Sequence, residues 1–454
     1  MVNAKNEELS RRNFLDRILR KTCLPFALAG YSGIQGAQDA ANSANKAAPA
    51  TGSPPPAAPP VSPEDDAFLE ELEHAEFQFF WEQTDPHSGL TKDRCHVRGE
   101  DNTLVASIAA TGFALTALCI GHNRGYISYP DARNRALNTL RFLWKEMPNH
   151  RGFFYHFANI KTGERIWDSE ISSIDTSMLL CGILTCRQHF RHAEITRLAY
   201  DILDRVEWTW LSEDTALLPH GWAPEVGFLP YRWDLYSELM MMYLLGLGST
   251  KHPLPPETWN SWKRMTFEFE GIRYIGSYAP LFIHQYSHAW FDLRGKRDKY
   301  ADYFQNSAIA TDVHRRFCLE LATEFSDYSD DLWGITASDS QNGYVVWGGP
   351  PRMGPIDGTV VPSAPGGSLA FSPQPTLRVL KYMKNHYGDR CWCRYGFINA
   401  FNPLKNWYDT DVVGIDTGIT MVMAENLRTG FVWNTFMKNR EAQKGLERAG
   451  FKPI

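Results

Sequence analysis

The amino-acid sequence predicts an all-α protein whose helices pair into a toroid, with long aromatic-rich loops gathered at one rim. Apolar residues recur at helical spacing along most of the chain, strand-like alternation is scarce, and no repeat indicates a solenoid of uniform units. An irregular α fold also fits, but a toroid of helical hairpins, six inner and six outer, accommodates ten or more helices and leaves the connecting loops at one rim. The predicted helices cover residues 66–84, 104–122, 130–147, 172–190, 194–208, 234–247, 256–268, 299–324, 370–388 and 415–438.

The N-terminal region is typical of an export signal followed by a linker. Arg11 and Arg12 resemble a twin-arginine signal, and the apolar stretch 24–37 is shorter than the roughly 20 residues that span a bilayer. A disordered basic tail is the alternative interpretation. The next residues are mainly Ala, Pro, Ser and Gly, a composition that does not support a folded core. We therefore expect a signal segment over 1–37, a linker over 38–63, a folded domain over 64–454 and a periplasmic or secreted location.

The amino-acid composition indicates which classes of binding partner are favoured and which are not. The net charge of -6 arises from 46 basic and 52 acidic residues without long runs, so nucleic acid is an unfavourable partner. The eight cysteines lack the paired C-x-x-C spacing of a structural zinc site, and we expect no bound metal and no cofactor. We also expect a monomer without a stable membrane span. The 15 Trp and 19 Tyr exceed what a core needs, and their flat faces suit sugar rings.

Long loops separate several of the predicted helices, at 214–233, 271–298 and 333–365. They are longer than the connections of compact bundles and are dense in Gly, Pro, Trp and Tyr. Loops held by a rigid scaffold are where binding and catalytic residues concentrate. We therefore expect the functional site beside these loops.

A first cluster of acids precedes the helix predicted at 172–190. The segment Trp167-Asp168-Ser169-Glu170 is followed by Asp175, which gives three carboxylates within eight residues. Asp168 or Ser169 is suited to capping the helix, while the other acids can point into a central cavity. Acids that only complement the helix dipole are an equally economical interpretation.

A second cluster contains the strongest single candidate. Glu238 follows Arg232, Trp233 and Tyr236, with Trp222 slightly earlier in the chain. Aromatic neighbours desolvate a carboxyl group and raise its pKa, as a general acid working near neutral pH requires. A capping Asp234 with Glu238 in a helical salt bridge is the alternative.

The remaining polar motifs predict hydrogen bonding to a ligand. His284 and His288 flank Tyr286, but the glutamate of the H-E-x-x-H zinc motif is absent. Further motifs bring Asp339, Asn399, Asn402 and Asp416. The sequence contains no G-x-S-x-G elbow, phosphate loop or dinucleotide-binding glycine triplet, so a pair of carboxylic acids remains the most economical chemistry.

Six motifs, taken in order, resemble those of bacterial glucoamylase-like domain proteins. They read WDSE-x-SSIDT, HGW-x-PE-x-GFLPYRWD-x-Y-x-E, PLF-x-HQYSHAW, TASD, RYGF-x-(N/D)AFNP and GID-x-G, and the resemblance extends over 74–451. This family is similar to endo-β-1,2-glucanases and to the corresponding domain of cyclic β-1,2-glucan synthases. The resemblance implies an (α/α)6 barrel whose central cleft binds β-1,2-linked glucose chains. Together with the export signal, it predicts an exported glycoside hydrolase that cleaves a β-linked glucan, most specifically β-1,2-glucan.

The resemblance also implies residue roles. Glu238 is the expected acid and Glu170 the second essential carboxylate, with Asp168, Asp175 and Asp416 as supporting or alternative candidates. The expected substrate-binding residues are Trp167, Trp222, Arg232, Trp233, Tyr236, His284, Tyr286, His288, Asp339, Asn399 and Asn402.

Three other functions remain open at this stage. A glucan transglycosylase would form longer or cyclic products. A non-catalytic glucan-binding protein could dispense with Glu170 and Glu238, but both are present. A polysaccharide lyase would use a Tyr or His base together with basic residues that neutralise a uronate.

Overall fold

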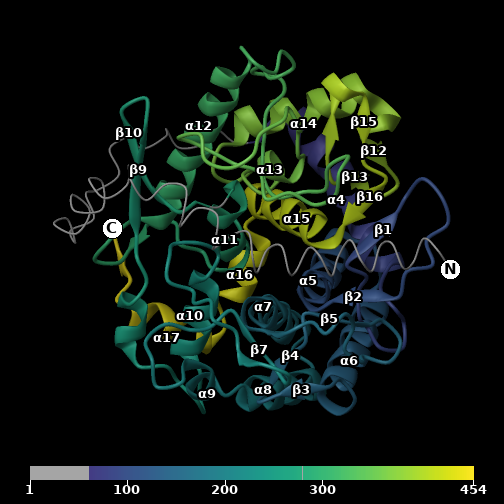
Figure 1. Ribbon diagram of the computed structural model, residues 1–454. Helices are drawn as coiled ribbons and strands as arrows, with labels where there is room; N and C mark the ends of the chain where they lie inside the picture. Colours follow the sequence, from purple (N-terminus) through teal and green to yellow (C-terminus); the bar gives the residue numbers. More distant parts are fainter. Residues whose placement is uncertain (1–60, 279) are drawn as a thin grey trace.

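Helices account for most of the regular structure in residues 61–278 and 280–454, which are the residues that this computed structural model describes (Figure 1). The predicted signal segment and nearly all of the predicted linker lie outside these residues. The helices are α4 (Pro63–Glu82), α5 (Ile108–Arg124), α6 (Tyr129–Lys145), α7 (Ser173–Phe190), α8 (Ala193–Arg205), α9 (Trp208–Ser212), α10 (Met240–Gly248), α11 (Tyr286–Trp290), α12 (Tyr303–Leu321), α13 (Ser363–Gly366), α14 (Pro373–Tyr387), α15 (Gly414–Arg428), α16 (Phe431–Phe436) and α17 (Arg440–Ala449).

Five of these helices form a closed circuit of contacts. Helix α5 packs against α7, α7 against α10, α10 against α11, α11 against α15, and α15 returns to α5. Other helices cover this circuit: α4 lies on α5 and α15, α6 and α8 lie beside α5 and α7, and α17 lies on α10. The chain therefore builds an inner ring of helices with an outer layer.

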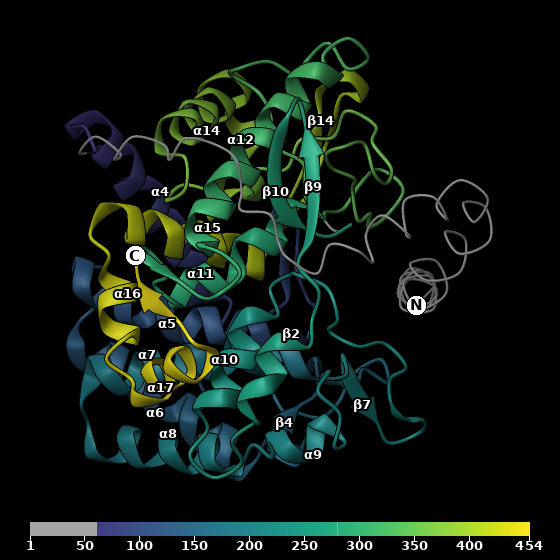
Figure 2. The same cartoon turned by 90° about the vertical axis from the view of Figure 1, so that its left-hand side faces the viewer.

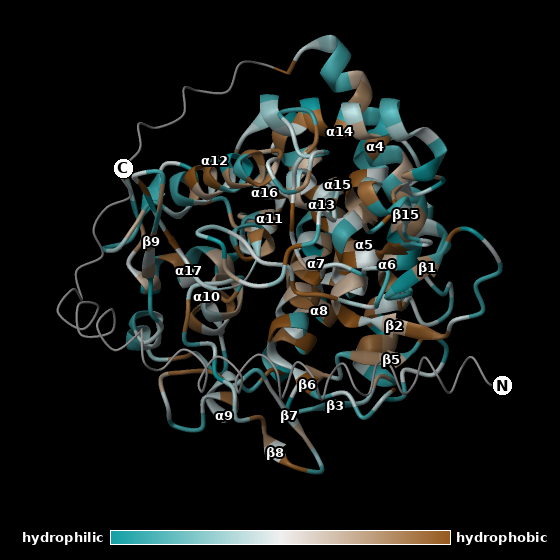
Figure 3. Cartoon of the chain, turned by 45° about the horizontal axis from the view of Figure 1, so that its top comes forward, coloured by the Kyte–Doolittle hydropathy of each residue, from teal (hydrophilic) through white to brown (hydrophobic). Residues whose placement is uncertain are grey.

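Burial distinguishes the two layers. Every residue of α10 is buried, and so are residues 108–121 of α5, whereas α8 buries only Ile195, Leu198, Ala199 and Ile202. The spacing in α8 places its apolar side chains on one face, as expected for a helix with one side in water. Figure 3 shows the same contrast, with hydrophobic colouring on the central helices such as α7 and hydrophilic residues along the outer α4 and α14.

Two glycines allow the inner helices α5 and α7 to approach closely. A Cβ atom placed on Gly182 would lie 2.1 Å from the carbonyl oxygen of Gly112, and one on Gly112 would lie 2.4 Å from that of Met178. The clashing atoms belong to the backbone and cannot move aside as a flexible side chain would. This contact therefore requires glycine on both helices.

Short strand pairs lead into three of the inner helices. Strand β2 (Val105–Ser107) pairs with β5 (Phe157–Asn159) before α5, β6 (Ile171–Ser172) pairs with β7 (Gly221–Ala223) before α7, and β16 (Asp411–Val413) pairs with β1 (Arg94–His96) before α15. Side chains of Ser107 and Ser172 then cap α5 and α7 by accepting hydrogen bonds from backbone N–H groups. The pairs fix the loops at these helix N-termini.

The other strands are short and lie in the loops. They are β3 (Asn149–His150), β4 (Phe153–Phe154), β8 (Gly227–Phe228), β9 (Met265–Phe269), β10 (Ile272–Gly276), β11 (Lys296–Arg297), β12 (Trp392–Cys393), β13 (Gly396–Phe397), β14 (Phe401–Asn402), β15 (Trp407–Tyr408) and β17 (Lys452–Pro453).

The structure corrects two of the predicted helices. Residues 256–268 form a short 3-10 turn at Pro256–Asn260 and then β9, which pairs with β10 in the hairpin seen in Figure 2. Exposure alternates along β9, and Glu270 and Gly271 both have positive φ, of 48° and 76°, which suits a tight hairpin turn. The predicted helix 415–438 is divided into α15 and α16 by Gly430, whose φ is 67°.

No helix within the described chain combines the length and hydropathy that a bilayer crossing requires.

We expect Gly182→Ala to lower the free energy of unfolding by about 1–3 kcal/mol, because the added methyl group must separate α5 from α7. Urea denaturation measures the change. Gly349→Ala is the matched control, since a Cβ at Gly349 meets nothing within 4 Å. Equal stability of the two variants would contradict the close-packing account.

Candidate active site

Acidic side chains at the N-terminal ends of three inner helices converge around Tyr286, the first residue of α11. Asp175 lies in the first turn of α7, Asp416 lies in the first turn of α15, and Glu238 precedes α10 by two residues. Burial raises the pKa of Tyr286, and the charges of Asp416, Glu238 and Asp175 raise it further. The N-terminal ends of these helices therefore meet at one place, where their dipoles favour negative charge.

Glu238 has the properties of a proton donor near neutral pH. Its side chain is half-buried, and burial together with the nearby charge of Asp175 raises its pKa to about 7. The Ser287 hydroxyl donates a 2.8 Å hydrogen bond to the Glu238 carbonyl oxygen, which ties this residue to α11. A carboxyl group with such a pKa carries a proton for much of the time near pH 7.

Glu170 is held in the opposite protonation state. Its Oε1 lies 3.0 Å from Nδ1 of His156, and the other ring nitrogen of His156 lies 3.6 Å from Oδ2 of Asp175. Burial raises the pKa of Glu170, but the charge and hydrogen bond of His156 outweigh burial and leave that pKa below its ordinary value. Glu170 is therefore ionised at pH values where Glu238 retains a proton.

Asp175 and Asp416 complete the set of acids. Burial raises the pKa of Asp175, although His156 and the hydroxyl group of Ser172 oppose the change. Burial also raises the pKa of Asp416, to about 7, against the hydrogen bonds that favour its ionised form. One of these bonds comes from Asn399, whose Nδ2 donates to Asp416 Oδ2 over 2.6 Å.

Asn399 joins Asp416 to a further group of acids around Arg94. Its Oδ1 accepts a 2.8 Å hydrogen bond from the backbone N–H of Asp339, and the Asp339 carboxylate forms an ion pair with Arg94. The same guanidinium lies 3.1 Å from Asp93 and 3.5 Å from Asp411. Arg94 thus balances the charge of three carboxylates from different segments.

A group of carboxylates that could hold a metal ion lies here. One oxygen each of Asp339, Asp409 and Asp411 falls within 4.8 Å of the others. Burial and the neighbouring charges of Asp339 and Asp411 raise the pKa of Asp409 to about 7. Arg94 already brings a positive charge to two of the three, so the chain supplies its own cation at this position.

The predicted tryptophans lie near the N-terminus of α7 and are partly exposed. Trp233 donates from Nε1 to the Ser173 hydroxyl over 2.9 Å and stacks on His220 with ring centroids 4.1 Å apart. Trp222 lies in β7, which pairs with the strand that follows Glu170, and Trp167 packs edge-on against a neighbouring ring. These positions bring indole rings close to the Glu170 side of the site.

Six of the predicted substrate-binding residues are buried in the protein: Tyr236, His284, Tyr286, His288, Asn399 and Asn402. The Tyr236 hydroxyl pairs with His284 Nδ1 at 3.1 Å, and His288 Nε2 pairs with the Ser307 hydroxyl at 3.2 Å. Tyr236 and His288 have no exposed surface, and Asn402 donates to a backbone carbonyl while it caps a short turn. The hydrogen bonds of Tyr236, His284, His288 and Asn402 therefore run within the protein.

Two further predicted residues make their contacts in surface loops. Asp168 is exposed, and its carbonyl oxygen accepts a 2.6 Å hydrogen bond from Arg165 in a turn with a φ of 54°. Arg232 lies 2.6 Å from Glu213, which follows α9. The first residue shapes the loop before Glu170, and the second joins two loop segments outside the acid group.

Several residues of the site were absent from the sequence-based prediction. They are Asp93, Arg94, His156, Tyr344, Asp409 and Asp411. Only Asp409 carries a usable signal in the sequence, because it directly follows the aromatic pair Trp407-Tyr408. Tyr344 lies in a loop close enough to Asp416 and Asp339 for their charges, added to burial, to raise the pKa of its hydroxyl.

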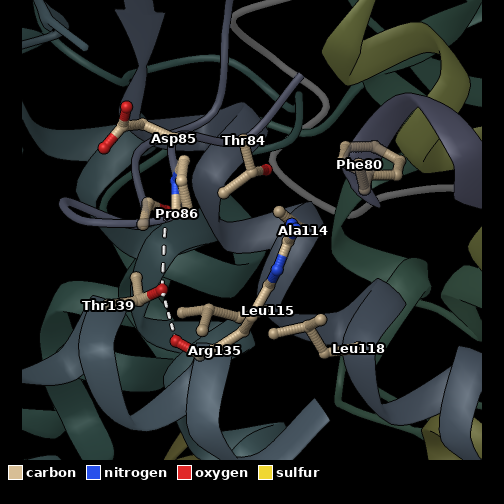
Figure 4. A pocket seen from close by; sticks show the side chains of 10 residues that line it. Phe80, Thr84, Asp85, Pro86, Ala114, Leu115, Leu118, Arg135 and Thr139 are labelled. Atoms are coloured by element: carbon tan, nitrogen blue, oxygen red, sulfur yellow. Dashed lines mark hydrogen bonds between the residues drawn. The ribbon is translucent and has the colours of Figure 1, made fainter. Parts of the chain in front are cut away.

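A separate pocket lies between α4, α5 and α6 and contains none of these acids (Figure 4). At this pocket the Thr139 hydroxyl donates a 3.0 Å hydrogen bond to the backbone carbonyl oxygen of Arg135. Its lining residues are Phe80, Thr84, Asp85, Pro86, Gly89, Ala114, Leu115, Leu118, Arg135 and Thr139. The chemistry of the acid group therefore does not extend into this pocket.

Comparison with known proteins places the fold and the site in context. A family model described as "Glycoamylase: Putative glucoamylase" matches residues 230–440. A crystal structure of a "putative glucoamylase" from Bacteroides fragilis is 30% identical, with coverage of 88% of this chain and 100% of that chain and a TM-score of 0.79. The endo-β-1,2-glucanase from Chitinophaga pinensis, in a complex with sophorotriose and glucose, is 28% identical, with coverage of 86% and 98% and a TM-score of 0.80.

A curated relative from Parabacteroides distasonis is named exo β-1,2-glucooligosaccharide sophorohydrolase (non-reducing end). It is 28% identical over 424 residues, which represent 85% of this chain. The chain spans 58% of the length of that relative.

We expect Arg94→Met to lower the free energy of unfolding by roughly 3 kcal/mol at pH 7, because three partly buried carboxylates lose their shared cation. Chemical denaturation measures this loss. The matched control is Arg378→Met, which breaks an exposed ion pair with Asp331 and should cost less than about 1 kcal/mol. An Arg94 variant no less stable than the control would exclude this charge-balancing role.

Proposed function

The chain belongs to the glucoamylase-like family, and from this premise we propose that it is a glycoside hydrolase that cleaves β-1,2-linked glucan. The observation that carries the proposal is the different surroundings of two carboxyl groups: burial raises the pKa of Glu238 to about 7, whereas His156, 3.0 Å from Glu170, outweighs burial and keeps the pKa of Glu170 below its ordinary value. Glycosidases use two such groups, one to protonate the leaving oxygen and one to attack or to activate water. The β-1,2 linkage is supported by the names of the similar proteins from Chitinophaga pinensis and Parabacteroides distasonis.

The same relationship supports an (α/α)6 barrel. In this proposal α5, α7, α10, α11, α13 and α15 are the inner helices. The closed circuit of five of them, and the packing of α13 on α15 and α14, are consistent with that order. The domain over 64–454 is then the catalytic domain, with its acids at the ends of the inner helices.

In the proposed mechanism Glu238 donates its proton to the glycosidic oxygen. Glu170, kept ionised by His156, is the second essential carboxylate and either attacks the sugar or accepts a proton from water. Asp416 is the alternative for this second role, because its charge also reaches Tyr286 and its pKa of about 7 leaves part of it ionised at neutral pH. Asp175 supports Glu238 by its negative charge, which raises the pKa of that acid, and it also lies 3.6 Å from the His156 ring that contacts Glu170.

The groups proposed to contact the sugar are those that remain beside the acids. They are Trp167, Trp222, Trp233, Tyr286, Asp339 and Asn399. The flat indole faces of the three tryptophans offer apolar surfaces on which pyranose rings can stack. A lyase is disfavoured, because Arg94, whose charge reaches Asp416, is already paired with three carboxylates. Transglycosylation uses the same acids and differs only in its acceptor.

We expect the purified chain to release short oligosaccharides from linear β-1,2-glucan and to leave β-1,3-glucan, β-1,4-glucan and starch intact. Glu238→Gln and Glu170→Gln should each lower kcat by about 10²–10⁴-fold, because each removes one half of the acid-base pair. Product chromatography measures both results.

The matched control is Asp168→Asn, which alters a neighbouring exposed carboxylate and should retain activity. Longer or cyclic products would favour the transglycosylase. Full activity in Glu238→Gln, or cleavage of none of the four glucans, would refute the assignment. Loss of activity in an Asp416→Asn variant alongside retained activity in Glu170→Gln would transfer the second role to Asp416.

We also propose that residues 1–37 direct export through the twin-arginine route to the periplasm or beyond. The adjacent Arg11 and Arg12 and the short apolar stretch after them support this proposal. Substitution of both arginines by lysine should leave the protein in the cytoplasmic fraction of a bacterial host, while the unaltered chain is exported. Equal export of the two forms, measured by fractionation and immunoblotting, would contradict it.

A further inference from the structure

His156 is placed between two acids of the site by local backbone structure. It directly precedes β5, and its backbone N–H donates a 2.9 Å hydrogen bond to the carbonyl oxygen of Glu170. The ring is stacked on Phe157, with ring centroids 3.9 Å apart and planes inclined by 14°. The imidazole is therefore fixed both by the main chain and by an aromatic neighbour.

Each nitrogen of this ring faces a different carboxylate. Nδ1 lies 3.0 Å from Glu170 Oε1, and Nε2 lies 3.6 Å from Asp175 Oδ2. A neutral imidazole has only one N–H and would direct a lone pair at one of the two carboxylates. The doubly protonated ring presents an N–H to both, so this arrangement selects the cation.

The surroundings of the ring favour the same state. Asp93, on the segment before β1, adds a third negative charge within reach of His156. Burial lowers the pKa of His156, but the charges of Asp175, Glu170 and Asp93 reverse that effect and raise it to about 9. His220, which faces Glu170 from the loop before β7, has a pKa lowered by burial to about 4 and is neutral in this range.

We propose that His156 is a positioning residue whose imidazolium cation holds Glu170 ionised and aligned with Asp175, so that the proton used in catalysis resides on Glu238. This proposal rests on the proposed function and adds to it the group that separates the roles of the two acids. His156 itself exchanges no proton with the substrate. It acts through Glu170, to which it is bound by both its ring and its backbone.

The consequence for pH dependence follows from the charges. The active form requires Glu170 ionised and Glu238 protonated, so kcat/KM falls at low pH as Glu170 gains a proton and falls at high pH as Glu238 loses one. An opposite charge at hydrogen-bond distance lowers a carboxyl pKa by about 1–3 units, so removal of His156 should move the acidic limb upward by that amount. Glu238 is perturbed chiefly by burial and by Asp175, so the basic limb near pH 7 should stay in place.

The experiment compares pH profiles of kcat/KM on β-1,2-glucan for the wild type, His156→Gln and His156→Lys. We expect the acidic limb of His156→Gln to rise by about 1–3 units, and His156→Lys to restore part of the shift because it returns a cation. His189→Gln is the matched control, since His189 lies on α7 at the end opposite to Asp175. Its two limbs should coincide with those of the wild type.

A uniform loss of activity in His156→Gln with both limbs unmoved would overturn the proposal, because a purely structural residue would behave in that way. An equal shift in His189→Gln would overturn it as well, since the effect would then not belong to His156.

A second readout separates this proposal from the proposed function. Nitrogen-15 NMR of histidine-labelled Glu238→Gln protein reports the protonation of each ring without any turnover, and His156→Gln assigns the signal. We expect both ring nitrogens of His156 to remain protonated at pH 7.5. A neutral ring at that pH would overturn the proposal even if the enzyme cleaves β-1,2-glucan. A protonated ring in a chain that is inactive on every glucan would support the contact of a cationic His156 with Glu170 and would refute only the proposed function.

Discussion

The crowding of carboxylates at the N-terminal ends of the inner helices is the constraint on which the rest of the site depends. Like charges at short range in a partly buried place are unfavourable, and they must be neutralised by cations, by hydrogen bonds or by protonation. This chain uses all three. Arg94 and His156 supply positive charge, Asn399 supplies a hydrogen bond, and burial keeps a proton on Glu238 near pH 7. The role of each acid follows from whether a cation, a hydrogen bond or a bound proton neutralises its charge.

The helical scaffold makes this arrangement possible because its inner ring is dry and closely packed. Gly112 and Gly182 let α5 and α7 approach to backbone contact, and α10 is buried along its whole length. Helices packed so tightly hold their N-terminal residues in fixed positions, which is what a catalytic group requires. The paired strands before α5, α7 and α15 then fix the loops that carry His156, Glu170 and Asp93.

Sequence periodicity located most of the long helices, because the helical spacing of apolar residues does not depend on which element the helix packs against. It failed at 256–268, where a strand alternates in exposure and a positive-φ turn at Gly271 closes a hairpin. Glu238 could be found because its aromatic neighbours are close in sequence. Arg94 and Asp339 are separated by 245 positions, so no local pattern announces their pairing. His284 has a polar side chain within an aromatic motif, and only the fold shows that it is buried and bonded to Tyr236.

The most direct test of the account is a crystal structure of the Glu238→Gln variant with a β-1,2-linked glucooligosaccharide. The account predicts a glycosidic oxygen within hydrogen-bond distance of residue 238, with the Glu170 carboxylate directed toward the anomeric carbon on the opposite side of that sugar or toward a water placed there. The separation of residues 238 and 170 in that complex would also show whether attack occurs directly or through water. An oligosaccharide bound away from Glu170 and residue 238, or one whose glycosidic oxygens contact neither, would contradict the central claim.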